Sequence, residues 1–286
     1  MDIYKTTLYI NFKFLQILLF RYYGFKPALF SLDEISKILF SLFSINIFSY
    51  ENNDDSSPIP TKNESGVVIS FDDDYVDNWE ETQHLLEQYN WKATFFITKF
   101  HLLSNEKIQK LQTLKSYGHE IGAHGQNHLK ATDFISNNGA NTYLEQEIHP
   151  MINLMDSNSL HASSFAYPYG ARNNTTDNLL LNEYKILRGT TYGRLGPSSH
   201  NCYYSRQRVV YGLGLDNSYA HFSISYFLSL LEYAKENNKI VIFYAHKPVE
   251  TAHADYETEY QTLIEICRYT QLNNMKFYTI SELSDL

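Results

Sequence analysis

The sequence predicts an α/β fold, a distorted (β/α) barrel of about seven parallel strands. From about Gly66 onward, short runs of β-branched and aromatic residues alternate with longer stretches of helical spacing. Strict alternation of this kind is typical of parallel β/α units. About seven such units fit a closed barrel better than an open sheet, and in a barrel the reactive side chains gather at the carboxyl ends of the strands.

The expected strands are short runs rich in Val, Ile, Phe and Tyr, residues that favour a buried, pleated backbone. They cover residues 67–71, 93–97, 119–123, 164–166, 185–189, 208–210, 239–244 and 276–278. The expected helices repeat apolar residues three or four positions apart. They cover residues 78–89, 105–117, 142–155, 177–183, 222–236 and 257–272, with a short last helix near Ser281. These elements define one domain over residues 66–286.

Residues 1–65 differ from the rest and predict an N-terminal leader, a signal-like segment and a flexible linker. The apolar stretch 8–20 is interrupted by polar residues and is too short for a membrane-spanning helix. A second apolar run, 35–49, precedes a polar segment, an order that resembles a signal peptide and a linker. Because a secretory signal normally begins a chain, one hypothesis places the natural start of translation near Ile35. We expect a periplasmic, cell-envelope or secreted protein; a pair of membrane-anchoring or peripheral N-terminal helices is the alternative.

Charge and cysteine content argue against two kinds of site. The net charge of −9 offers no basic surface for a phosphate backbone, so no nucleic acid is expected as a partner. Cys202 and Cys267 have no CxxC spacing, which argues against a cysteine metal site and leaves open one disulfide or two buried thiols. Nothing in the sequence indicates a stable protein partner.

Polar side chains follow four of the expected strands directly. Asp72 and Asp73 follow the first strand, His124 the third, the segment 167–170 the fourth and His246 the seventh. Because the carboxyl ends of parallel strands meet at one mouth of a barrel, we expect these groups to converge there.

His124 and His128 stand four residues apart. On a helical turn this spacing places both imidazoles on one side, where they can share a metal. With a carboxylate from another strand end, they form a set of two histidines and one aspartate that leaves positions open for water and substrate. Zn²⁺ suits these ligands, and Co²⁺, Ni²⁺ or Fe²⁺ also bind nitrogen and oxygen donors.

Asp72 and Asp73 are adjacent, so in a regular strand they would face opposite ways. Both reach the mouth of the barrel only if the strand ends there and the backbone turns. Two bare carboxylates this close would favour a shared proton, whereas a metal on one leaves the other free as a base. The alternative is an acidic loop before the helix that starts at Asn78, with Asp77 as its N-cap.

Together these motifs resemble the polysaccharide deacetylase family, also called the NodB-homology domain or carbohydrate esterase family 4, over about residues 66–286. The family motif Thr-Phe-Asp-Asp-Gly corresponds to Ser-Phe-Asp-Asp-Asp at 70–74, and His-(Ser/Thr)-x-x-His corresponds to His-Gly-Gln-Asn-His at 124–128. Arg-x-Pro-Tyr-Gly corresponds to Ala-Tyr-Pro-Tyr-Gly at 166–170, and Leu-x-His to Tyr-Ala-His at 244–246.

The resemblance implies a metal-dependent hydrolase that removes N-acetyl or O-acetyl groups from an acetylated glycan of the cell envelope or outside the cell. Water at the metal would attack the acetyl carbonyl. The implied roles are Asp72 as general base, His246 as general acid, the Tyr169 backbone N–H as oxyanion donor, and Asp73, His124 and His128 as metal ligands. The alternatives are a weakly active or inactive glycan-binding module of the same fold, and a hydrolase of a small amide.

Three positions depart from the family motifs. Asp74 stands where the family has Gly, and we expect it to keep the turn because Asp tolerates positive φ better than most residues. Gly125 stands where a Ser or Thr would support the metal ligands. Ala166 stands where an Arg would hold the base, with Arg172 and Arg208 as candidate replacements.

Overall fold

The computed structural model describes residues 65–286, and its first strand, β1, begins at Gly66. The leader, signal-like segment and linker predicted for residues 1–65 therefore lie outside the described residues, apart from the last one. Within the described part, the helices are too short or too polar for any of them to span a lipid bilayer.

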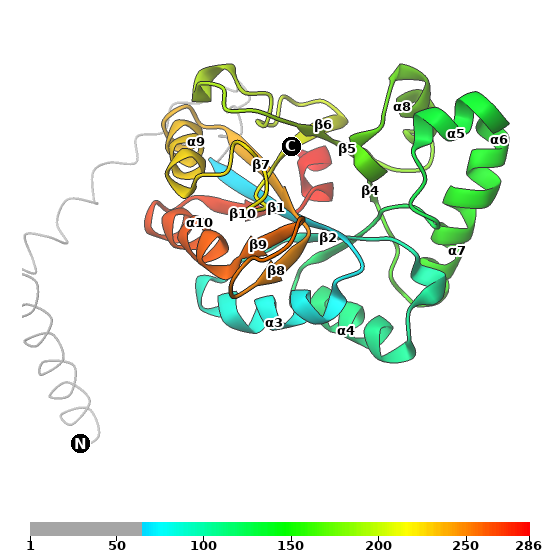
Figure 1. Cartoon of the computed structure of the whole chain (residues 1–286), viewed down its shortest axis with the longest axis horizontal. Helices are drawn as coiled ribbons and strands as arrows, with labels where there is room; N and C mark the ends of the chain where they lie inside the picture. Colours follow the sequence, from blue (N-terminus) through cyan, green and yellow to red (C-terminus); the bar gives the residue numbers. More distant parts are fainter. Residues whose placement is uncertain (1–64) are drawn as a thin grey trace, which may run out of the picture. The chain divides into compact units, whose positions relative to one another are not determined.

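The described strands and helices alternate along most of the chain (Figure 1). The strands are β1 (Gly66–Asp73), β2 (Thr94–Ile97), β3 (Glu120–Ala123), β4 (Ser164–Ala166), β5 (Ile186–Thr191), β6 (Val209–Gly214), β7 (Ile240–Ala245), β8 (Lys247–Val249), β9 (Glu257–Glu259) and β10 (Lys276–Tyr278). The α-helices are α3 (Val76–Leu86), α4 (Asn105–Ser116), α5 (Ala131–Asn138), α6 (Ala140–Tyr143), α7 (His149–Ser157), α8 (Asn174–Leu180), α9 (Ile224–Glu236) and α10 (Tyr260–Leu272). A π-helical turn, η4 (Leu144–Ile148), joins α6 to α7, and a 3₁₀ turn, η7 (Ser281–Asp285), ends the chain.

Strands β1 to β7 form a closed ring in chain order, and every pairing in the ring is parallel. The ring closes where β1 pairs with β7, from Gly66↔Ile240 to Phe71↔Ala245. The helices lie around the outside of the strands (Figure 1). This arrangement confirms the predicted (β/α) barrel of about seven parallel strands.

The barrel is distorted beside β1. The carboxyl-terminal half of β1 pairs with β2, from Ser70 to Asp73, whereas its amino-terminal half pairs with β10, from Gly66 to Val68. Strand β10 therefore fills the gap that opens between β1 and β2 at the amino end of the barrel. Strand β10 does not cover the mouth of the barrel at the carboxyl ends of the strands.

Successive side chains of a strand point alternately toward the surrounding helices and into the barrel, so the two faces of the strands form separate apolar clusters. On β1, Val67, Ile69 and Phe71 belong to the larger apolar cluster, which includes the helices, whereas Val68 belongs to a second cluster made by the interior faces. Asp72 has the same parity as Val68 and therefore points into the barrel. The interior is thus apolar near its amino end and becomes polar toward the mouth.

Local structure departs from the predictions in three places. The helix predicted over 142–155 is three pieces, α6, η4 and α7, and helix α5 before it was not predicted. The helix predicted from Glu257 starts at Tyr260, because Glu257–Glu259 forms β9 and pairs with β8. The alternative with Asp77 as the N-cap of this first helix is wrong. The residue before α3 is Tyr75, and the Asp77 carboxylate lies 2.8 Å from the Lys110 ammonium group.

Candidate active site

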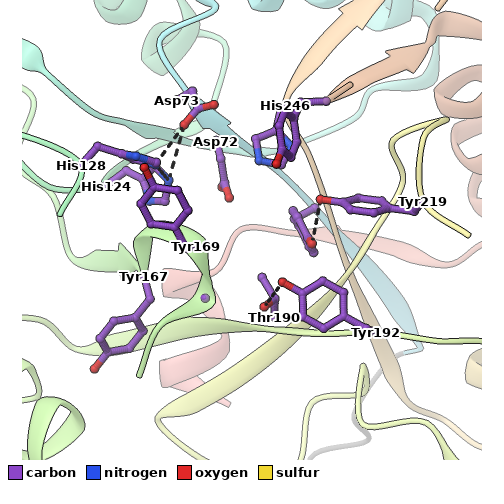
Figure 2. A pocket seen from close by; sticks show the side chains of 13 residues that line it. Asp72, Asp73, His124, His128, Tyr167, Tyr169, Thr190, Tyr192, Tyr219 and His246 are labelled. Atoms are coloured by element: carbon purple, nitrogen blue, oxygen red, sulfur yellow. Dashed lines mark hydrogen bonds and ion pairs between the residues drawn. The ribbon is translucent and has the colours of Figure 1, made fainter. Parts of the chain in front are cut away.

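All six residues predicted for the site line one pocket at the carboxyl ends of the strands (Figure 2). Asp72 and Asp73 end β1, His124 and His128 follow β3, Tyr169 follows β4 and His246 follows β7. The rule that reactive side chains follow the strands of a parallel barrel, here called the strand-end rule, therefore predicted a pocket whose residues lie far apart in the chain. Asp72 and His246 are 174 positions apart.

Asp73, His124 and His128 form a compact set of potential metal ligands. The Asp73 Oδ1 atom lies 3.3 Å from His128 Nε2 and 3.7 Å from His124 Nε2, and the two Nε2 atoms are 3.2 Å apart. Two ligand atoms at the usual Zn–N distance and a tetrahedral angle would be about 3.4 Å apart. The three donor atoms thus have the separations that a tetrahedral cation with one further open position requires.

The backbone that presents these ligands is a loop, which corrects the prediction of a helical turn. Residues 124–128 contain two residues with positive φ, Gly125 at 84° and His128 at 60°. The positive φ predicted for Asp74 is also misplaced by one residue, since Asp73 adopts it, with φ 83°. This left-handed residue turns the chain at the end of β1, so that Asp72 and Asp73 both reach the pocket although they are neighbours.

One hydrogen bond sets the tautomer of His124. Its Nδ1 lies 2.8 Å from the backbone oxygen of Ala166, which can only accept, so Nδ1 carries the proton and Nε2 presents a lone pair to the ligand set. Burial lowers the pKa of His124 to about 4, which favours this neutral form. Burial raises the pKa of Asp73, but the hydrogen bond with His128 and the nearby histidines outweigh it and lower that pKa to about 2.

Asp72 is paired with an arginine that the sequence analysis did not single out. Arg188 on β5 is fully buried, and its Nη2 donates to both carboxylate oxygens of Asp72, itself only 3% exposed. The guanidinium lies between two aromatic rings, with its central carbon 5.4 Å from the centroid of Phe96 and 5.0 Å from that of Tyr244. Arg188 thus occupies the interior of the barrel beside the carboxylate.

The two candidate replacements for the motif arginine are wrong, because both have other partners. Arg172 donates to the Asp177 carboxylate and to the Tyr211 hydroxyl. Arg208 donates to three backbone carbonyls near the start of β5. Neither contacts Asp72.

His246 is held by a buried carboxylate, Asp216, which the sequence analysis also missed. The His246 Nδ1 donates to Asp216 Oδ2 at 2.6 Å, and the His246 backbone N–H donates to Oδ1 at 3.1 Å. Thr258 donates to the same Oδ1 at 2.6 Å, and the Trp79 indole N–H donates to the His246 carbonyl at 3.1 Å. This leaves Nε2 of His246 as the ring nitrogen available to the pocket.

Burial lowers the pKa of His246, but the hydrogen bond and charge of Asp216, together with the charges of Asp72 and Asp73, outweigh it and raise that pKa above its ordinary value. Asp216 lies just after β6, so the strand-end rule would have found it only if this strand had been predicted to reach Gly214.

Tyrosines form much of the pocket wall (Figure 2). Tyr192 and Tyr256 are 55% and 51% exposed, and Tyr169, beside His128, is 61% exposed. Thr190 donates to the Tyr192 hydroxyl at 2.8 Å, and Tyr244 donates to the Tyr219 hydroxyl at 3.0 Å. The wall therefore offers flat apolar faces and several hydroxyl groups to a ligand.

Residues 60–185 match the model of the family described as polysaccharide deacetylase. Over these residues the chain is similar to the polysaccharide deacetylase family. A peptidoglycan-N-acetylglucosamine deacetylase from Bacillus cereus is 39% identical over 87 residues, which cover 30% of this chain and 38% of that protein. The chain therefore matches well under half the length of this relative.

Two solved structures share the fold. The Xyl-CE4 domain of a multidomain xylanase from the hindgut metagenome of Trinervitermes trinervoides has a TM-score of 0.51 at 18% identity, covering 78% of this chain and 91% of that one. The chitin deacetylase of the fungus Colletotrichum lindemuthianum has a TM-score of 0.51 at 15% identity, covering 79% and 91%. Both similarities extend beyond residue 185, so the shared fold includes strands that follow the matched residues.

Proposed function

We propose that this chain is a metal-dependent hydrolase that removes acetyl groups from a polysaccharide of the cell envelope. One observation carries the proposal: three side chains that could hold a metal ion share a pocket with two charge-paired groups, Asp72 paired with Arg188 and His246 paired with Asp216. The match of residues 60–185 to the polysaccharide deacetylase family supports this reaction class.

Asp73, His124 and His128 would hold the metal, since one carboxylate oxygen and two imidazole nitrogens are a donor set that Zn²⁺ accepts in catalytic sites. Co²⁺, Ni²⁺ and Fe²⁺ are compatible with the same donors. When bound, the ion supplies polarisation of the acetyl carbonyl and a pKa near 7 for the water it carries.

Asp72 serves as the general base in this proposal. Its carboxylate, paired with Arg188, would accept a proton from the attacking water. The guanidinium also fixes the position of the carboxylate in the pocket wall, next to the Asp73 ligand. The backbone N–H of Tyr169, a residue that lines the pocket, would donate to the oxyanion that forms on the acetyl carbonyl.

His246 serves as the general acid and protonates the departing amine or alkoxide from Nε2. Asp216 holds the ring by Nδ1 and stabilises its protonated form. Because its pKa is raised, the acid stays protonated to a higher pH than an ordinary histidine would.

Replacing Asp216 with Asn tests this role. The substitution removes the charge that raises the pKa of His246, so that pKa falls and the acid is lost at lower pH. We expect the alkaline limb of the pH profile of kcat/KM to move toward acid by about 1 unit or more, the usual effect of an adjacent opposite charge. The measurement is acetate release across a pH series.

Asp156→Asn is the matched control, because Asp156 contacts His161 at 2.9 Å on the surface and not in the pocket. This control keeps the wild-type profile. An alkaline limb that stays in place in Asp216→Asn would show that Asp216 does not set the proton affinity of the acid.

An acetylated glycan is the proposed substrate. Sugar rings stack on aromatic faces and exchange hydrogen bonds through their hydroxyls, and the wall formed by Tyr192, Tyr219 and Tyr256 offers both. The B. cereus relative is named for a peptidoglycan amino sugar, which supports an N-acetyl group in the cell envelope as the target. A signal-like segment in residues 1–65 would agree with that location.

The pairings favour an active enzyme over a glycan-binding module. A binding site needs no buried partner for either Asp72 or His246, and burying two charged pairs costs desolvation energy. The two pairs place a candidate base and a candidate acid in one pocket, an arrangement that suits proton transfer.

Acetate release from defined glycans tests the proposal. With added Zn²⁺ or Co²⁺, we expect release from N-acetylated chito-oligosaccharides or peptidoglycan fragments, with acetylated xylan as the O-acetyl comparison. His124→Ala removes a ligand and lowers release to background, whereas His84→Ala, at an exposed position of α3, leaves it unchanged. If the wild type is as inert as His124→Ala on every glycan, the chain is a binding module or acts on another substrate.

A further inference from the structure

Glu147 lies beneath the loop that joins the two histidine ligands. Its side chain is fully buried in the π-helical turn η4. The Oε2 atom accepts from the backbone N–H of Asn127 at 2.8 Å and from the Asn127 side chain at 3.1 Å. The Oε1 atom accepts from the backbone N–H of Leu129 at 2.9 Å. One carboxylate therefore holds the backbone on both sides of His128.

The backbone of the same turn adds two contacts. The Glu147 carbonyl accepts from the Gln126 N–H at 3.1 Å, and the Gln146 carbonyl accepts from the Asn127 side chain at 3.1 Å. Pro150 follows Gln146 by four residues and has no N–H, so it cannot make the helical bond that would occupy this carbonyl. The Gln146 carbonyl therefore lacks its usual α-helical donor and accepts from the loop. Such π turns are frequent at functional sites.

Gly125 makes room for this carboxylate. A Cβ atom at position 125 would lie 2.3 Å from Glu147 Oε1, closer than any real contact, and the φ of +84° already disfavours a side chain. The loop and the carboxylate therefore fit each other only with glycine there. This accounts for a departure that the sequence leaves unexplained, the glycine where the family motif has a hydroxyl residue.

We propose that Glu147 is a positioning residue for the metal centre: its carboxylate fixes the 124–128 loop in the conformation that presents both Nε2 atoms to one ion. The inference rests on the proposed metal site and names the group that orders it. A carboxylate suits this position because it has two acceptor oxygens for three N–H groups. A glutamine has one acceptor oxygen, and its NH₂ group would face a backbone N–H.

Metal binding by Glu147→Gln tests the inference directly. The chelator-treated full chain is titrated with Zn²⁺ by calorimetry, and with Co²⁺ while its visible absorption is recorded. We expect the dissociation constant to rise by about 10- to 100-fold, the usual effect of losing a group that orients metal ligands, and the Co²⁺ spectrum to change. Gly125→Ala, which keeps Glu147 but displaces its carboxylate, should weaken metal binding in the same direction.

Glu145→Gln is the matched control, because Glu145 is exposed on the same π turn. It keeps the wild-type dissociation constant. A purely structural role would lower the melting temperature of the metal-free protein in Glu147→Gln without changing the Zn²⁺ dissociation constant or the Co²⁺ spectrum, and that result overturns the inference while leaving the proposed function intact. If the wild type itself binds no metal, the proposed function fails and the inference fails with it.

Discussion

Asp72→Asn is expected to lower kcat/KM for acetate release by about 10²- to 10⁴-fold, the range for losing a general base or acid. Asparagine keeps the shape of the side chain but cannot accept the proton of the attacking water. The three proposed metal ligands are untouched, so the variant should bind Zn²⁺ as the wild type does. The measurement is initial-rate kinetics beside a Zn²⁺ titration.

Asp74→Asn is the control for this substitution. Asp74 is a carboxylate two residues further on, is partly exposed and does not line the pocket. We expect its kcat/KM to stay within a few-fold of the wild-type value, because surface substitutions usually have small effects. A fully active Asp72→Asn would mean that another group takes the proton, and the assignment of the base would be wrong.

Arg188→Met should reduce both stability and activity. It leaves the Asp72 carboxylate buried without its counter-charge, and breaking a buried pair in this way costs about 3–5 kcal/mol of unfolding free energy. The carboxylate would also lose the donor that fixes its position in the pocket, so acetate release should fall as well. Urea unfolding and initial-rate kinetics of acetate release measure the two effects.

A double-mutant cycle separates the pair from general damage. Combining Arg188→Met with Asp72→Asn removes both charges, so the double variant should be more stable than Arg188→Met alone. Arg206→Met, at an exposed position, serves as the control for losing an arginine and should change stability by about 0.5 kcal/mol or less. Additive losses in the cycle would show that Arg188 and Asp72 do not stabilise each other.

Much of the fold and pocket follows from local patterns in the sequence. Runs of β-branched and aromatic residues located the strands, and the rule that parallel strands meet at their carboxyl ends placed Asp72, His124 and His246 at one mouth. These inferences needed only the neighbours of each residue along the chain.

The charged partners of Asp72 and His246 could not be predicted from such local patterns. Arg188 contacts Asp72 across 116 positions of sequence, and both faces of the start of β5 are buried, so no alternation reveals which side chains enter the barrel. Asp216 follows a strand predicted to be shorter than it is, which hid its place at the mouth.

The spacing of His124 and His128 could not predict whether the backbone between them is a helix or a loop, for a related reason. A helix brings such residues together, but so does a loop with two left-handed residues, and the bonds that select the loop come from Glu147, which lies elsewhere in the sequence.

The most direct test of the account adds Zn²⁺ stepwise to the chelator-treated chain and measures acetate release from an N-acetylated glycan. We expect no release without metal, a rise in proportion to the Zn²⁺ added, and a plateau at about one ion per chain, as a single site of three protein ligands requires. His128→Ala, which lacks one ligand, should stay flat over the same additions. Release that survives chelation, or a wild type that gains nothing from any divalent metal, would contradict the account.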